Sequence, residues 1–347
     1  MQAITLDQAG MALVERHRRW WRREETLVTR VEGEPLGTLW LPLIGGIDAT
    51  EDTRLTPEMV DVERLVGAVR EPGTIDIVGD TFAIVQPFTR VPWLEAILGN
   101  PVEALIQGGS MRTHRFVDGW EDWHGVTAHR QDAWFRLLMQ ITELLVERSG
   151  GRAATVAPIL RGPSDLAEAV LGPELMIYSL YDHPDRMRRF LDEVTDLFTE
   201  VHNGLLRRFA PVAGGTVSYF GIWAPGTVVR TQCDASAFLS AKLYRDWFVA
   251  YDLRTCEGAD TSIIHLHSCS MHTVDALLET PLPHAIQVIL EEGPNVPTLR
   301  ALLPTFRRIL EVKPLLIEGK LTDDEVAWLL DVLPPGGLAI TARRASW

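Results

Sequence analysis

The chain contains very little cysteine, with only Cys233, Cys256 and Cys269 among its 347 residues. Three scattered thiols are too few for a disulfide framework, which argues against a small disulfide-stabilised extracellular domain. The sequence also lacks an apolar run of the roughly 20 residues needed to cross a bilayer. No signal peptide precedes the first amphipathic segment. We therefore expect a cytoplasmic protein in a reducing setting, without a membrane partner.

Positive charge is also scarce. The chain has 33 lysines and arginines against 47 acidic residues, which gives a formal net charge of −14. Such a surface repels phosphate backbones, so a nucleic-acid partner is not expected. One basic, aromatic segment at residues 16–23 could contact an acidic membrane or a partner, but Glu24 and Glu25 interrupt its basic face. We favour a peripheral helix whose Trp20 and Trp21 pack on the body of the protein.

No glycine-rich phosphate loop follows any apolar run, which removes the main signature of a dinucleotide-binding fold. What the sequence does contain is a series of short runs rich in Val, Ile and Leu, without polar alternation. Such runs are typical of strands that are buried on both faces of a parallel sheet. The predicted strands are 38–44, 75–84, 153–160, 216–223, 262–267, 285–290, 314–317 and 338–341.

Longer amphipathic segments separate these runs, and we predict helices at 184–209, 240–257, 297–310 and 322–333. The last begins with a capping box in which Thr322 and Glu325 satisfy each other's exposed amides. Eight strands that alternate with helices predict an α/β fold, specifically a (β/α)₈ TIM barrel spanning 35–347. A helical extension at 1–34 would precede it. An open, doubly wound sheet is the alternative.

Functional side chains of such a barrel lie at the carboxyl ends of its strands, and the most polar of these ends follows strand 262–267. Residues two apart on a strand point to the same side, so His265 and His267 can face one point, and Cys269 can join them if the strand continues. Imidazole and thiolate are ligands that Zn²⁺ prefers. The alternative is a pair of hydrogen-bonded core histidines, with Cys269 packed as a small apolar residue.

Carboxylates follow other predicted strands. Glu291 comes directly after the run 285–290 and could be a metal ligand or a general base, although a solvated loop residue is equally consistent with its position. Asp80 interrupts the apolar run at 75–84 and is either a site residue or the partner of a nearby arginine. Asp234 could cap a turn or orient a bound substrate. We predict catalytic roles for Glu291, Asp80 and Asp234.

Five further residues are candidates for binding a substrate. Arg230 and Gln232 belong to a polar cluster before the helix at 240, and an arginine such as Arg161 or Arg230 could hold a carboxylate. Trp40 and Trp223 lie in strands or near strand ends, where an aromatic-lined mouth would suit a flat ring or a methylated cation. Ordinary packing is the alternative for each tryptophan.

The order of these motifs resembles the uroporphyrinogen decarboxylase superfamily, which includes cobalamin-dependent methyltransferases of the coenzyme M type and O-demethylase methyltransferases. The resemblance covers nearly the whole chain from about residue 35. The matching stretches are Val78-Gly79-Asp80-Thr81-Phe82, Leu160-Arg161-Gly162-Pro163-Ser164-Asp165-Leu166-Ala167 with Leu171-Gly172, Asp234…Phe238-Leu239-Ser240, Ile264-His265-Leu266-His267-Ser268 and Pro334-Pro335-Gly336-Gly337-Leu338.

Two departures from the family narrow its implications. The Arg-Gln-Ala-Gly-Arg segment with which uroporphyrinogen decarboxylases hold porphyrinogen carboxylates is missing, so that activity is not expected. The family's zinc methyltransferases bind metal through His-x-Cys and a second, late Cys. In this chain His265-Leu266-His267 stands in place of His-x-Cys, and residues 338–344, where the second Cys would be expected, contain no cysteine. Glu291, Cys269 or Cys233 would have to supply a further ligand. Such a harder site suits an oxygen or nitrogen substrate better than a thiol.

The resemblance therefore implies a zinc-assisted methyltransferase that moves a methyl group from a small methoxy-aromatic or methylamine to a corrinoid protein or tetrahydrofolate. Its partners would be this substrate, the corrinoid protein and a second copy of the chain in a homodimer. The alternative is a metal-free decarboxylase or lyase of a small carboxylated compound, with His265 or His267 as general acid. A barrel that only binds a ligand is a third interpretation.

Overall fold

A seven-stranded sheet is the largest sheet of the described residues. A computed structural model describes residues 3–32, 49–67, 76–87, 92–105 and 110–343. The strand order is β10-β11-β12-β13-β14-β1-β3, and all neighbours are parallel except β1 and β3. The strands of this sheet are β1 (Leu27–Glu32), β3 (Asp76–Gly79), β10 (Val228–Gln232), β11 (Thr261–His267), β12 (Ala285–Ile289), β13 (Leu315–Lys320) and β14 (Leu338–Arg343).

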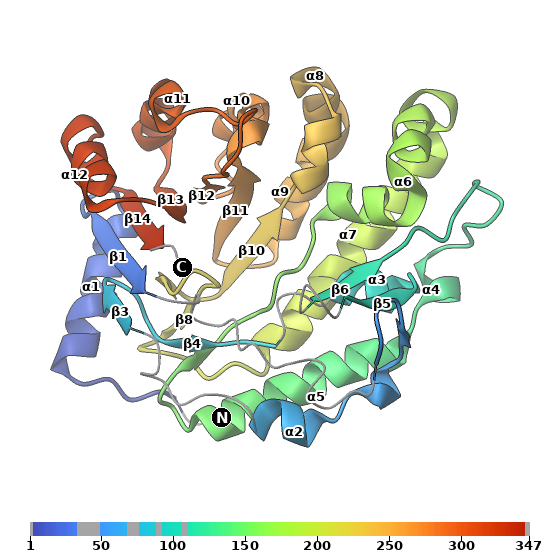
Figure 1. Cartoon of the computed structure of the whole chain (residues 1–347), viewed down its shortest axis with the longest axis horizontal. Helices are drawn as coiled ribbons and strands as arrows, with labels where there is room; N and C mark the ends of the chain where they lie inside the picture. The colour runs from blue at the N-terminus through green and yellow to red at the C-terminus, as the bar shows by residue number, and fades with distance from the viewer. Residues whose placement is uncertain (1–2, 33–48, 68–75, 88–91, 106–109, 344–347) are drawn as a thin grey trace.

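Helices cover the outer side of this sheet. Figure 1 shows α9, α10, α11 and α12 beyond strands β10 to β14, with α5, α6 and α7 around the remaining part of the molecule. Apolar side chains of the strands and of the inner helix faces form one large buried cluster. The longer helices are α1 (Gln8–Trp21), α5 (Asp132–Ser149), α6 (Pro163–Asp182), α7 (Pro184–Leu206), α9 (Val249–Glu257), α11 (Leu299–Val312) and α12 (Asp323–Val332). The shorter helices are α2 (Val62–Gly67), α3 (Trp93–Leu98), α4 (Val126–His129), α8 (Ala241–Leu243) and α10 (Val274–Leu278).

The remaining strands form three small ladders apart from the main sheet. They pair β4 (Ile84–Val85) with β7 (Ala154–Thr155), β8 (Gly215–Val217) with β9 (Trp223–Pro225), and β2 (Arg54–Leu55) with β5 (Val102–Leu105) and β6 (Ser110–Thr113). The prediction of an α/β fold is thus confirmed. Within the described residues, however, the hydrogen-bonded strands do not close into a ring.

Several predicted elements agree with the structure. Strands β11, β12, β13 and β14 and helices α7, α11 and α12 occupy the predicted segments to within a few residues. The segment 240–257 is helical, although it contains a π-helical turn at Tyr244–Phe248 between α8 and α9. The capping box of Thr322 and Glu325 is present at the start of α12.

Other predictions are corrected. The run 216–223 is not one sheet strand but the antiparallel pair β8 and β9, and the sheet strand of this region is β10, further along the chain. The run 75–84 divides into β3 and β4. Strand β1 lies within the predicted extension 1–34 yet pairs with β14 in the main sheet. The predicted strand 38–44 lies outside the described residues.

The N-terminal helix α1 was predicted to pack outside the strands, but it lies at their amino ends instead. Its Trp20 is buried among Val228, Ile263 and Leu316, on the face of the sheet that also carries Arg230 and His265. The buried His17 of α1 accepts a hydrogen bond at Nδ1 from the backbone amide of Trp223 at 2.8 Å. The Nε2 of the same ring lies 3.0 Å from the backbone oxygen of Asp80. Burial lowers the pKa of His17 to about 4, so the ring is neutral and fits between a donor and an acceptor. Helix α1 is thereby joined to two distant segments.

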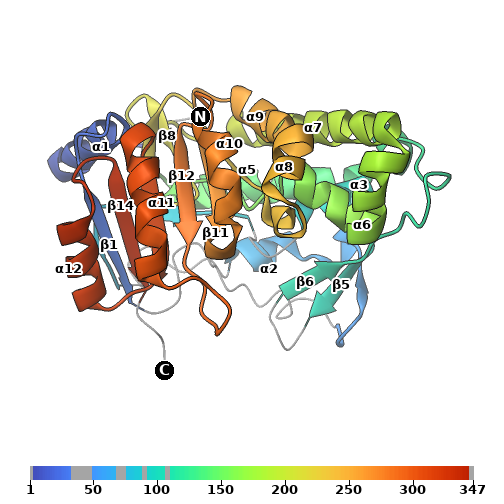
Figure 2. The ribbon, with the colours of Figure 1, turned by 90° about the horizontal axis from the view of Figure 1, so that it is seen from above.

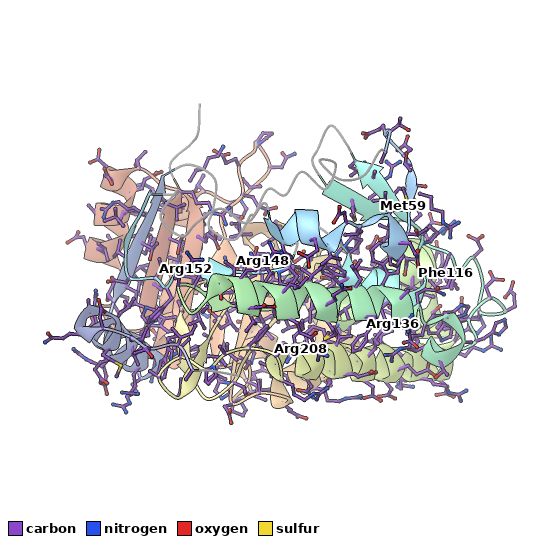
Figure 3. All side chains as sticks on the ribbon, turned by 90° about the horizontal axis from the view of Figure 1, so that it is seen from below. Met59, Phe116, Arg136, Arg148, Arg152 and Arg208 are labelled. Atoms are coloured by element: carbon purple, nitrogen blue, oxygen red, sulfur yellow. The ribbon has the colours of Figure 1, made fainter. Side chains whose placement is uncertain are left out.

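Helices α5 and α7 lie next to each other along one flank, which Figure 3 views from below with Arg148 and Arg208 labelled. Arg208, just beyond the end of α7, donates to Glu143 of α5 over 2.7 Å. Figure 2, which shows the ribbon from above, shows that the carboxyl ends of the parallel strands point away from α1. No helix in the described part of the chain has the length and apolar character needed to cross a membrane.

Candidate active site

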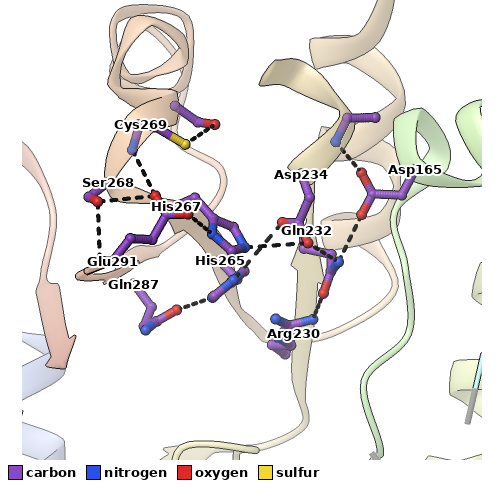
Figure 4. A network of polar contacts seen from close by, with 12 residues as sticks. Asp165, Arg230, Gln232, Asp234, His265, His267, Ser268, Cys269, Gln287 and Glu291 are labelled. Atoms are coloured by element: carbon purple, nitrogen blue, oxygen red, sulfur yellow. Dashed lines mark hydrogen bonds and ion pairs between the residues drawn. The ribbon is translucent and has the colours of Figure 1, made fainter. Parts of the chain in front are cut away.

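Polar side chains line the carboxyl ends of neighbouring strands at one edge of the sheet. The register places Gln232 of β10 opposite His265 of β11, which in turn lies opposite Gln287 of β12. His265 and His267 are two residues apart and face the same side of β11, where Figure 4 shows both imidazoles directed toward the chain that follows β10. Apolar residues alternate with this row on β11 and β12, whereas β10 also carries Arg230 and Thr231.

Asp234, His265 and His267 form the tightest group of potential ligands. One ligand atom from each residue lies within 4.8 Å of the other two. The Nε2 of His267 is 3.6 Å from Oδ2 of Asp234, and the Nε2 of His265 is 4.0 Å from Oδ1 of the same carboxylate. Asp234 begins the short 3₁₀ helix Asp234–Phe238 directly after β10. The local chain reversal after the strand brings its carboxylate over the two rings.

His265 is held by a chain of side chains that crosses three further strands. Its Nδ1 bonds Oε1 of Gln287, whose Nε2 donates to Oε2 of Glu318 over 3.1 Å. Glu318 is also paired with Arg343 of β14. Because Glu318 accepts from the Gln287 amide nitrogen, the Gln287 oxygen faces His265, and Nδ1 of His265 carries the proton. The Nε2 lone pair therefore faces Asp234.

The protonation of His265 follows from its surroundings. Burial and, secondarily, the charge of Arg230 lower the pKa of His265 to about 3, against the opposing effects of Asp234 and Gln287. The ring is therefore neutral at physiological pH, and its free nitrogen is a good donor to a cation.

His267 lies between two carboxylates. Its Nδ1 donates to Oε1 of Glu291 over 3.0 Å, and its Nε2 faces Asp234. The close approach of the Asp234 carboxylate comes first among the causes that raise the pKa of His267 to about 9, and Glu291 contributes further. Glu291 is in turn fixed by Oγ of Ser268 at 3.2 Å and by the backbone amide of Cys269 at 3.3 Å. Without a cation at Nε2, this ring carries a positive charge at neutral pH.

A buried carboxyl group supports Asp234 from behind. The Nε2 of Gln232 donates to Oδ2 of Asp165 over 2.8 Å and to Oδ2 of Asp234 over 2.7 Å. Asp165 also accepts from the backbone amide of Ala235 at 2.8 Å. Burial, reinforced by the charge of Asp234, raises the pKa of Asp165 to about 7. The first turn of α6 thus fixes the loop that carries Asp234 (Figure 4).

The group Asp234, His265 and His267 fits a metal ion by two observations. Its donors, one carboxylate and two imidazoles, are the number and type found in catalytic zinc sites. In addition, Oδ1 of Asp234 is buried without a hydrogen-bond partner in the described part of the chain. Ligand atoms in a tetrahedral zinc site are about 3.3–3.6 Å apart. The observed separations exceed this by up to about 1.5 Å, which small side-chain rotations can close.

The hydrogen bonds at Nδ1 of His265 and His267 also agree with metal binding at Nε2. Gln287 and Glu291 hold Nδ1 of His265 and His267, respectively, which leaves both Nε2 atoms facing the same carboxylate. An acceptor behind a histidine is the usual arrangement around metal ligands, because it fixes the tautomer and the orientation of the ring.

The structure brings most of the predicted site residues together. Gln232, Asp234, His265, His267 and Glu291 belong to the network of Figure 4, in which Arg230 bonds the side-chain oxygen of Gln232. Arg161 lies nearby, with its Nε 3.2 Å from Glu95, and the charge of Glu95 is the first cause of its raised pKa.

Three of the cysteine and carboxylate predictions are changed by the geometry. Cys269 is exposed, and its thiol is outside the ligand group, although the residue contacts Glu291 through its backbone amide and its side chain. Cys233 is fully buried. Glu291 is hydrogen-bonded to Nδ1 of His267, and it does not belong to the group of ligand atoms that Asp234, His265 and His267 form. The third member of the group is therefore Asp234, which the sequence indicated as a catalytic residue but not as a metal ligand.

Three other predicted residues are not in the cluster. Asp80 follows β3 at the opposite edge of the sheet, where it pairs with Arg16 and accepts from the backbone amide of Val28 at 2.9 Å. Trp223 is buried in β9, with its indole nitrogen bonded to the backbone of Val212. Both residues therefore support the fold on the side of α1. Trp40 lies outside the described residues.

Four residues of the network were missed as site residues by the sequence analysis: Asp165, Gln287, Glu318 and Arg343. A signal was present for two of them. Gln287 is the single polar residue of the strand Ala-Ile-Gln-Val-Ile, and Glu318 follows an equally apolar run. Buried polar side chains in such positions require partners, which points to a network.

Comparison with known proteins gives a likeness of fold. No protein-family model and no curated protein sequence matches the chain. Among solved structures, a methyltransferase from Methanosarcina mazei superposes with a TM-score of 0.54 at 10% sequence identity. The match covers 90% of this chain and 86% of that one. The chain therefore shares its α/β architecture with a methyltransferase over nearly its full length.

Proposed function

We propose that the protein is a metal-dependent methyltransferase of the uroporphyrinogen decarboxylase superfamily. It takes a methyl group from a small methoxy-aromatic or methylamine and passes it to a corrinoid protein or tetrahydrofolate. The observation that carries this proposal is the convergence of Asp234, His265 and His267 at the carboxyl end of β11. The fold shared with a methyltransferase supports the reaction type.

In this proposal Asp234 and the Nε2 atoms of His265 and His267 hold a zinc ion. Bound zinc supplies a Lewis acid to the heteroatom that carries the methyl group. Gln287 and Glu291 keep the two rings oriented, and Gln232 holds the Asp234 carboxylate in place. The methyl group leaves without its bonding electron pair and bonds to the nucleophilic carrier, so the products are the demethylated substrate and the methylated carrier.

The substrate residues of the proposal are Arg230, Gln232 and Arg161, whose side chains lie around Asp234.

The (β/α)₈ barrel is also part of the proposal. The parallel pairing of β4 with β7 supports it, as does the close contact between Gly162 and Gln232. A Cβ atom at Gly162 would lie 2.0 Å from the backbone oxygen of Gln232. A corrinoid protein and a second copy of the chain remain the proposed partners.

The test is methyl transfer to reduced cobalamin by zinc-loaded protein, measured with a panel of methoxy-aromatics and methylamines. We expect methylcobalamin to form with at least one donor in the wild-type protein. Asp234→Asn should abolish it, while Cys269→Ser, a change at a nearby exposed residue outside the ligand group, should leave it intact. Failure with every donor in metal-replete protein would refute the proposed reaction.

The alternative function, decarboxylation of a small carboxylated compound without metal, is favoured by one observation. In the metal-free protein His267 is charged and faces the site, as a general acid must. Elemental analysis of the protein purified without chelators separates the two. About one zinc per chain supports methyl transfer, whereas a metal-free protein that releases carbon dioxide from such substrates supports the alternative.

A further inference from the structure

We propose that Arg230 forms a carboxylate-binding subsite, so that the substrate is a small molecule with a methylated heteroatom at one end and a carboxylate at the other. The identity of the substrate as a methyl donor rests on the proposed function. The anionic subsite itself rests on the surroundings of one side chain.

Arg230 is a buried cation with an incomplete set of partners. It lies in the middle of β10 and is only 7% exposed. Its Nη1 donates to the side-chain oxygen of Gln232, and its guanidinium carbon lies 5.4 Å from the centre of the Tyr219 ring. Its Nε is buried without any hydrogen-bond partner in the described chain. A guanidinium has five donor hydrogens in a planar fork, and a neutral amide satisfies only part of this capacity.

The nearby carboxylates are engaged elsewhere. None of the ion pairs within 4.0 Å among the described residues includes Arg230, because Glu318 pairs with Arg343 and Asp234 faces the two histidines. Asp165 accepts from Gln232 and from the amide of Ala235. The charges of Asp234, Asp165 and Glu318 also act on Arg230 through space. A buried charge without a bonded counter-ion is unfavourable, and an incoming anion would relieve this.

Position then indicates how such an anion fits the site. Arg230 precedes Gln232 by two residues, so both side chains point to the same face of β10, with Arg230 further from the carboxyl end of the strand. In Figure 4 the guanidinium lies beneath Gln232 and on the same side as His265. A substrate bound to Arg230 at one end would extend toward Asp234, His265 and His267.

The chemistry favours a carboxylate over a phosphate. A guanidinium fork matches the two oxygens of a carboxylate, with which it forms paired hydrogen bonds. A phosphate dianion would carry a larger negative charge toward Asp165, Asp234 and Glu318. One buried arginine surrounded by three carboxyl groups is suited to a singly charged anion.

The test compares matched ligands by equilibrium calorimetry, without turnover. One pair is 4-methoxybenzoate and 4-methoxybenzamide, and the other is N,N-dimethylglycine and its amide. Each ligand is titrated into metal-free and zinc-loaded full-length protein. Wild type should bind at least one carboxylate about 10-fold or more tightly than the matching amide, as expected for hydrogen bonds to a charged group. In Arg230→Met the carboxylate and the amide should bind equally.

Arg300→Met is the matched control, because Arg300 also lies over an aromatic ring, Trp328 at 4.8 Å, but is exposed on α11. It should keep the wild-type preference. Arg230→Lys should keep part of it, since the charge remains and the fork is lost. The melting temperature of Arg230→Met should equal or exceed that of wild type, because a buried guanidinium is exchanged for an apolar chain.

The results divide cleanly between the two proposals. Lack of a carboxylate preference in both ligand pairs, or a preference that survives in Arg230→Met, overturns the subsite. A preference that depends on Arg230 in a protein that transfers no methyl group supports the subsite and refutes only the proposed reaction.

Discussion

His265 and His267 lie two residues apart on one strand, yet their surroundings give them opposite protonation states. His265 is buried with the charge of Arg230 nearby, and its pKa falls to about 3 in spite of Asp234. His267 lies between Asp234 and Glu291, and its pKa rises to about 9. A cation at the shared point would replace the proton of His267 and add to the neutral nitrogen of His265. Metal binding and the charge of His267 are therefore mutually exclusive.

The raised pKa of His267 predicts how the stability of the metal-free protein depends on pH. A histidine whose pKa is higher in the folded than in the unfolded state stabilises the fold fully below pH 6.5, and this contribution is lost as pH rises through about 9. Because His267 is partly exposed, we expect a loss of about 1–2 kcal/mol between pH 6.5 and 9.5 after solvent screening. Urea unfolding of chelator-treated protein measures it.

His267→Gln should remove this decrease above pH 6.5. The matched control is His114→Gln, since His114 also pairs with a carboxylate, Glu103, but does so on the surface. The control should retain the wild-type pH dependence. If the His267→Gln protein loses stability above pH 7 as steeply as wild type, the ion pairs assigned to His267 are wrong.

At the scale of elements, strands β11 to β14 act together on His265. The chain from Gln287 through Glu318 to Arg343 places one polar group on each successive strand. A strand that shifted its register by one residue would turn its member of the chain to the other face of the sheet. The network therefore couples the pairing of four strands to the orientation of one imidazole.

Gln287→Leu tests this coupling. The apolar side chain fills a similar space but leaves His265 Nδ1 and Glu318 without their partner, which should lower the stability by about 1–3 kcal/mol. Zinc affinity should fall by about 10–100-fold, the usual effect of removing a group that orients a metal ligand. Gln131→Leu, at an exposed amide before α5, is the control for both quantities. An unchanged zinc affinity in Gln287→Leu would contradict the coupling.

The elements also show what local sequence can and cannot predict. The run Ile-Ile-His-Leu-His is apolar enough to be recognised as a strand, and its two histidines were predicted to share a face. Strand β10 was missed because Arg230, Thr231 and Gln232 look like loop residues, although all three are buried. Their partners come from α6 and from Asp234, and tertiary contacts of this kind override local polarity.

The third ligand was not assigned for the same reason. Asp234 reaches the histidines because Asp165, nearly 70 positions earlier in the chain, bonds Gln232 and the amide of Ala235. Spacing within the motif favoured Cys269 instead, since it continues the two-residue alternation. The 3₁₀ helix Ser268–Thr273 ends that alternation directly after His267 and turns the thiol away.

At the scale of the whole molecule, helix α1 and helix α7 depend on buried neutral histidines. His17 joins α1 to Trp223 and Asp80, and His202 is buried on α7 in a stacked contact with Phe198. Burial lowers the pKa of both to about 4. Protonation of either ring would place a charge in the core. Protonation of His17 would also break the hydrogen bond that it accepts from the backbone amide of Trp223.

These depressed pKa values predict acid sensitivity of the fold. The unfolded histidines bind protons near pH 6.5 and the folded ones near pH 4, so this contribution to stability is complete above pH 6.5 and is lost as pH falls toward 4. We expect the free energy of unfolding to fall by several kcal/mol, at about 1.4 kcal/mol per pH unit for each histidine. Urea titrations at pH 7, 6 and 5 measure this. Asp165, whose pKa is raised to about 7, changes the stability in the opposite direction, so a His17→Gln, His202→Gln double variant isolates the contribution of the histidines. A pH dependence in this variant equal to that of wild type would contradict two buried neutral histidines.

The central claim is that Asp234, His265 and His267 hold one metal ion, and equilibrium zinc binding to chelator-treated protein tests it most directly. The account predicts one tight site in wild type and in Cys269→Ser. It predicts a loss of affinity of more than about 100-fold in each of Asp234→Asn, His265→Gln and His267→Gln, with the fold retained by circular dichroism. Absence of a tight site in wild type, or a site that survives these three changes and is lost in Cys269→Ser, would contradict it.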